Sequence, residues 1–157
     1  GRPAQAPYLA RGRGLSRGRL HIVHAIIGHR MGGGLMDENR KFGLVGRFIY
    51  EFQKVRATLS ALYQMLEDRA AESELPELAL TELAIRTAAL FAQRRAADVV
   101  AVSGFNAVIE IVQKYGARLD DLLSQVDLDN VPDEAEIEGL LNCQHELERY
   151  QRLLGAS

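Results

Sequence analysis

The chain has a single cysteine, Cys143, no tryptophan and only four prolines. One thiol cannot form an intrachain disulfide, so the fold must depend on its apolar core, and a reducing compartment is the natural inference. Cys143 lies within a helical pattern, where a free cysteine is usually a buried, inert residue of the core or its boundary. A reactive thiol is the alternative.

Long apolar runs are also missing. The longest, residues 20–27 and 99–102, are much shorter than the roughly 20 residues that a membrane-spanning helix needs. No charged segment followed by an apolar stretch and a small-residue cleavage site marks a secretory signal peptide. We therefore expect a soluble, intracellular protein in the cytoplasm, with no membrane contact.

Acidic residues are absent from residues 1–36, which carry six arginines, whereas residues 37–157 carry all 21 acidic residues against 13 basic ones. Three consecutive glycines at residues 32–34 predict a linker, because glycine disfavours the interior of helices and strands. The chain is therefore divided into a flexible basic arm with its linker, residues 1–36, and a single domain, residues 37–157.

The arginine and glycine content of the arm is typical of flexible tails that bind nucleic acid. Arginines neutralise phosphates, while glycines let the backbone follow the strand. The predicted polyanion contacts are Arg11, Arg13, Arg17 and Arg19. Three other interpretations stay open: upstream or non-native sequence before a true start at Met31 or Met36, an organellar transit peptide, and a solvated tail.

From residue 37 onward the apolar residues recur with helical spacing. Between residues 45 and 66 they alternate steps of three and four, which keeps one face of a helix against its neighbours. This stripe consists of Val45, Phe48, Phe52, Val55, Leu59, Leu62 and Leu66. Ile49 and Tyr63 widen it, which favours a globular bundle over an extended coiled coil. We expect this helix to end near Ala71.

The next stretch predicts further helices. An alanine-rich helix is expected from Pro76 to about Val102, where Ser103 and Gly104 interrupt the pattern. A shorter helix follows and stops at Gly116, a residue type that often ends helices. Another short amphipathic segment covers residues 119–126. Periodicity does not decide whether residues 76–115 form one helix or two.

The last helix has the best-defined start. Residues 127–132 break the pattern, Pro132 suits a first helical turn, and acidic residues follow at the favourable end. We expect this helix to run to about Leu154. The predicted fold is all-α: a bundle of four to five helices with a flexible basic N-terminal arm, and no hairpin signal points to a β-rich alternative.

Candidate metal sites are weak. Asp127, Asp129, Asp133 and Glu138 match positions of a calcium-binding loop, but Val131 and Pro132 replace its central oxygen ligand and glycine, so these acids are predicted to cap a helix. The histidines of the arm, His21, His24 and His29, lack a rigid element and an acidic partner. His145 lacks the paired motif of a di-iron bundle and is expected at the surface.

No phosphate-binding loop or nucleophile elbow is present, so we expect no cofactor and favour a non-enzymatic role over an enzyme. By elimination, the predicted role is protein–protein association or assembly, with itself or another protein. The first helix has more large aromatic side chains than one bundle face needs. The predicted interface comprises Phe42, Phe48, Tyr50, Phe52 and Tyr63. The alternatives are a nucleic-acid-associated small subunit using the arm and an all-α metal-dependent hydrolase.

Overall fold

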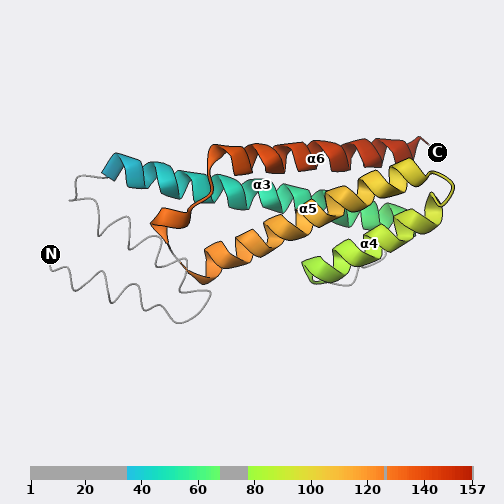
Figure 1. Ribbon diagram of the computed structural model, residues 1–157, viewed down its shortest axis with the longest axis horizontal. Helices are drawn as coiled ribbons and strands as arrows, with labels where there is room; N and C mark the ends of the chain where they lie inside the picture. Colours follow the sequence, from blue (N-terminus) through green and yellow to red (C-terminus); the bar gives the residue numbers. More distant parts are fainter. Residues whose placement is uncertain (1–34, 68–77, 126, 157) are drawn as a thin grey trace. The chain divides into compact units, whose positions relative to one another are not determined.

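The computed structural model describes residues 35–67, 78–125 and 127–156. These residues form four α-helices and a short 3-10 helix, and they contain no strand (Figure 1). In chain order the elements are α3 (Leu35–Glu67), α4 (Leu80–Arg94), α5 (Val99–Ser124), η1 (Leu128–Asn130) and α6 (Glu134–Gly155). The predicted all-α helical bundle is confirmed. The predicted basic arm lies outside the described residues.

The chain divides into two compact units. Unit 1 takes the described residues up to Ile49 together with Ala117–Ile137, and unit 2 takes Tyr50–Gly116 and Glu138–Ser157. Helices α3, α5 and α6 therefore contribute residues to both units. The single domain over residues 37–157 stays a prediction.

The apolar stripe of α3 is buried as its spacing predicts. All seven of its members are at most 8% exposed, and four of them are fully covered. Burying an aliphatic or aromatic side chain of this size contributes about 1.5–3 kcal/mol, so the stripe is a main source of stability. The described part of α3 ends at Glu67, and the predicted end near Ala71 lies outside the described residues.

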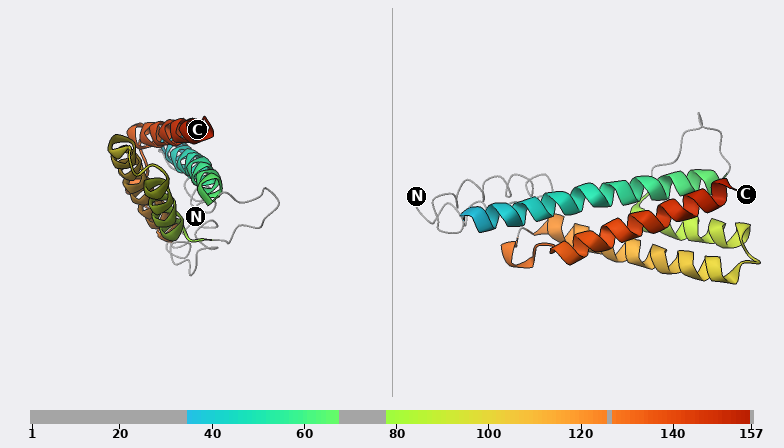
Figure 2. Two further views of the ribbon diagram at one scale, coloured as in Figure 1. Left: turned by 90° about the vertical axis from the view of Figure 1, so that its right-hand side faces the viewer. Right: turned by 90° about the horizontal axis from the view of Figure 1, so that it is seen from above.

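In unit 2, parts of all four helices lie side by side (Figures 1 and 2). Phe91 of α4 and Phe105 of α5 stack with their ring centroids 4.3 Å apart. Tyr150 of α6 meets both rings edge-on, at 5.4 and 5.1 Å. The aromatic cluster thus holds α4, α5 and α6 together. On another side of α6, Gln144 Nε2 donates a hydrogen bond to Thr58 Oγ1 of α3 at 2.8 Å, which connects α6 to α3.

Residues 76–115 do not form one helix, because a turn separates α4 from α5. The turn is closed by hydrogen bonds from Arg95 N to Phe91 O and from Asp98 N to Arg95 O, both 2.9 Å. Asp98 then caps α5, since its Oδ1 accepts a hydrogen bond from Ala101 N at 3.0 Å. The predicted extension of the alanine-rich helix to Val102 is therefore wrong.

The predicted breaks at Ser103–Gly104 and at Gly116 are also wrong, because α5 runs through both. These glycines lie where other helices approach closely. A Cβ atom at residue 104 would stand 2.6 Å from Tyr150 Oη, and one at residue 116 would collide with the Leu80 side chain. Because glycine has no side chain, Gly104 and Gly116 allow close packing of these helices, and neither of them ends α5. The predicted amphipathic segment after Gly116 is the last part of α5.

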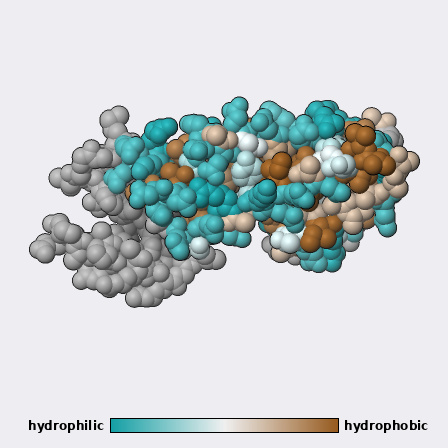
Figure 3. Space-filling view, viewed as in Figure 1, coloured by the Kyte–Doolittle hydropathy of each residue, from teal (hydrophilic) through white to brown (hydrophobic). Residues whose placement is uncertain are grey.

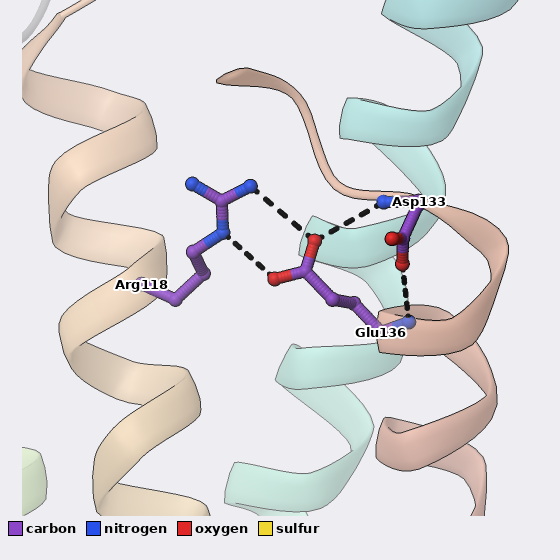
Figure 4. Close-up of polar contacts among 3 residues, drawn as sticks. All are labelled: Arg118, Asp133 and Glu136. Carbon is purple, nitrogen blue, oxygen red and sulfur yellow. Dashed lines mark hydrogen bonds and ion pairs between the residues drawn. The ribbon is translucent and has the colours of Figure 1, made fainter.

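In unit 1, the predicted break before the last helix is confirmed and contains η1, which Asp127 caps by accepting a hydrogen bond from Asp129 N. Helix α6 then begins with a reciprocal capping box (Figure 4). Asp133 Oδ1 accepts from Glu136 N at 2.8 Å, and Glu136 Oε2 accepts from Asp133 N at 3.1 Å. The capping role predicted for the acids of this turn is thus confirmed for Asp127 and Asp133.

Glu136 also connects two helices of unit 1. Its Oε1 accepts a hydrogen bond from Arg118 Nε at 2.9 Å, and its Oε2 accepts a longer one from an Arg118 terminal nitrogen at 3.3 Å. The fork-like guanidinium therefore engages both carboxylate oxygens (Figure 4). One glutamate both closes the first turn of α6 and ties it to α5.

Candidate association surface

Four of the five residues predicted as an interface lie in the core. Phe42, Phe48, Phe52 and Tyr63 are 9, 0, 2 and 2% exposed. In unit 2 the reason is that α3 packs against three helices, so a wider arc of it is covered than one bundle face requires. Tyr63 Oη also donates a hydrogen bond to Glu67 Oε2 at 2.8 Å. The aromatic side chains beyond the needs of one bundle face are therefore buried within the chain itself.

Tyr50 is the one member of the five that reaches the surface, with 62% of it exposed. The ammonium group of Lys54 lies 5.0 Å from the centre of its ring, within the range of a cation–π contact. The four arginines predicted to contact a polyanion lie outside the described residues.

Among the described residues, the most exposed large apolar side chains lie on α5, which the sequence analysis did not predict. Val99 and Val100 are 73% and 83% exposed, and Ile111 on the same helix is 42% exposed. Figure 3 shows hydrophobic surface over the beginning of α5. The available sequence signal is the pair of valines itself, because neighbouring helical residues lie about 100° apart and seldom both face one core.

An outer stripe runs along α5 at helical steps of four, three, four and three. It consists of Val100, Gly104, Ala107, Ile111 and Lys114. Val100, Ala107, Ile111 and Lys114 are exposed, while Gly104 is half-buried against α6. The spacing places these five residues on one face. We call this face the α5 outer stripe.

The buried face of α5 is on the other side of the same helix. Phe105, Val108, Ile109 and Val112 are each at most 7% exposed. The core therefore already has its own apolar residues from α5. The outer stripe is a second, smaller and mostly apolar face that nothing in the described part of the chain covers completely.

The beginning of α5 is held firmly by its surroundings. Phe105 is fully buried in the aromatic cluster, one turn after Val100 and Ala101. The turn before the helix is tied to α6, because an Arg95 terminal nitrogen donates a hydrogen bond to Leu153 O at 3.1 Å. Because cap, cluster and turn fix the helix, the exposed valines are presented on a rigid support.

Unit 1 has a polar cleft of about 270 Å³ at the end of α5. Asp121, Ser124, Gln125, Asp127 and Asn130 line it, together with Leu122. Among the described residues, no group of three or more histidines, cysteines or acids is arranged to hold a metal ion. The described residues of the cleft therefore do not support the alternative of a metal-dependent hydrolase.

The candidate histidines of the arm, His21, His24 and His29, lie outside the described residues, and the candidates Cys143 and His145 lie on α6. Cys143 is 5% exposed, as expected for a core residue, and burial raises the pKa of its thiol to about 11, with nearby Glu146 adding to the shift. The thiol is thus protonated at neutral pH, which disfavours reaction as a nucleophile. His145 is exposed, and its expected place at the surface is confirmed.

In the described segments, every helix is too short or too polar to traverse a bilayer. The chain matches no model of a known protein family, and no curated protein or solved structure is significantly similar to it. No residue role is therefore carried over from a relative, and function is inferred from the surface of α5.

Proposed function

We propose that this chain functions by protein–protein association, as a small helical interaction or assembly subunit, and that α5 supplies the contact surface. The observation that carries the proposal is the exposure of Val99 and Val100, 73% and 83%, on a rigidly supported first turn. Removing apolar surface from water stabilises a complex by roughly 25 cal/mol per Å². A partner that covers these side chains gains that free energy without reordering the helix.

The composition of the α5 outer stripe also supports association through α5. Isolated exposed apolar residues are common and need no explanation. Here Val100, Ala107 and Ile111 share one face of one helix, and the single charge of the outer stripe, Lys114, stands at its end. Interfaces commonly have this arrangement, in which charged residues avoid the centre and lie at the rim.

Photo-crosslinking in the cells that make the protein tests the proposal. A photoreactive amino acid is placed at Val100 in the full chain, and in a matched variant at Asn142, which is exposed on α6 of the same unit. We expect a covalent adduct with a protein from position 100 and none from position 142. No adduct from position 100, or equal adducts from both positions, would contradict the proposal.

A second candidate is binding of nucleic acid through the arm, which is favoured by its six arginines and lack of acids. Binding through phosphate contacts weakens steeply with salt, because condensed counterions are released. This candidate predicts salt-sensitive binding of a nucleic-acid duplex or single strand that disappears when residues 1–30 are deleted. Undiminished binding by the truncated chain would exclude the arm from the contact.

A further inference from the structure

We draw no further inference here: the strongest candidate, the exposed apolar face at the beginning of α5 formed by Val99 and Val100, is the surface already proposed for association, and nothing in the part of the chain that the structure describes shows what covers it.

Discussion

Gly104 of α5 faces the phenol of Tyr150 of α6 so closely that a Cβ atom at residue 104 would lie 2.6 Å from Tyr150 Oη. The phenol cannot easily move aside. Tyr150 is 2% exposed, and its ring is held edge-on against Phe91 and Phe105. The missing side chain at residue 104 therefore sets how closely α5 and α6 pack.

Gly104→Ala should lower the free energy of unfolding by about 1–2 kcal/mol, because the cost of overpacking exceeds the roughly 1 kcal/mol that alanine gains in helix propensity. Urea denaturation at low protein concentration measures the change. In a Tyr150→Phe background, which lacks the colliding oxygen, the same substitution should cost less. An equal cost in both backgrounds would show that Tyr150 is not the constraint.

Gly46→Ala is the matched control in α3. No atom of the described residues lies within 4 Å of a Cβ atom at residue 46, so alanine meets no obstacle from them. Its better helix propensity should raise the free energy of unfolding by about 0.5–1 kcal/mol. A loss of stability at this position would contradict the packing described for α3.

Substitutions of Asp133 and of Glu136, the two residues of the α6 capping box, should change the free energy of unfolding by different amounts. Asp133→Ala removes the acceptor for Glu136 N and should destabilise the chain by about 0.5–2 kcal/mol, while Asp133→Asn keeps an acceptor and should cost little. Glu136→Gln weakens the pair with Arg118, whose side chains are 18% and 31% exposed, and should cost less than about 1 kcal/mol. Denaturation of the three variants decides whether cap or ion pair dominates.

Cys143 should react slowly in the folded chain. With a pKa of about 11 against an ordinary value of 9.0, its thiolate fraction at pH 8 is about a hundredfold lower than in the unfolded chain. Alkylation by iodoacetamide, with and without urea, measures the ratio. Similar rates in both conditions would mean that the thiol is accessible and ionised.

The same pKa shift affects stability at high pH. Folding raises the pKa, so it favours the protonated thiol. Any stability linked to this group is present below about pH 9 and is lost as the pH rises toward 11. Cys143→Ala should remove this part of the pH dependence of unfolding between pH 9 and 11. A profile unchanged by the substitution would assign the high-pH loss to other groups.

The parts of the fold that sequence predicts are those carried by repeated spacing. The α3 stripe has seven members in one register, so all of them had to share a face, and all are buried. The turn before α5 was missed because its signal is one capping aspartate without a nearby glycine or proline. Gly104 and Gly116 were misread because glycine both ends helices and permits close packing, and the local sequence is the same in either case.

The association surface was harder to predict for a similar reason. Aromatic content marks residues that seek burial, but it does not say whether a neighbouring helix of the same chain or a partner covers them. Four of the five residues chosen that way are buried within the chain. Val99 and Val100 sit in an apolar run that reads as core, and only the direction of α5 after its turn shows that they face outward.

The accessibility of residue 100 in the cell tests association through α5 most directly. Val100→Cys and, as control, Asn142→Cys are each made in a Cys143→Ser background, so that one thiol reacts. We predict that a thiol at residue 100 is alkylated several times more slowly in cells than in the dilute purified chain, while a thiol at residue 142 reacts alike in both. Equal rates at residue 100 in both settings would contradict the account.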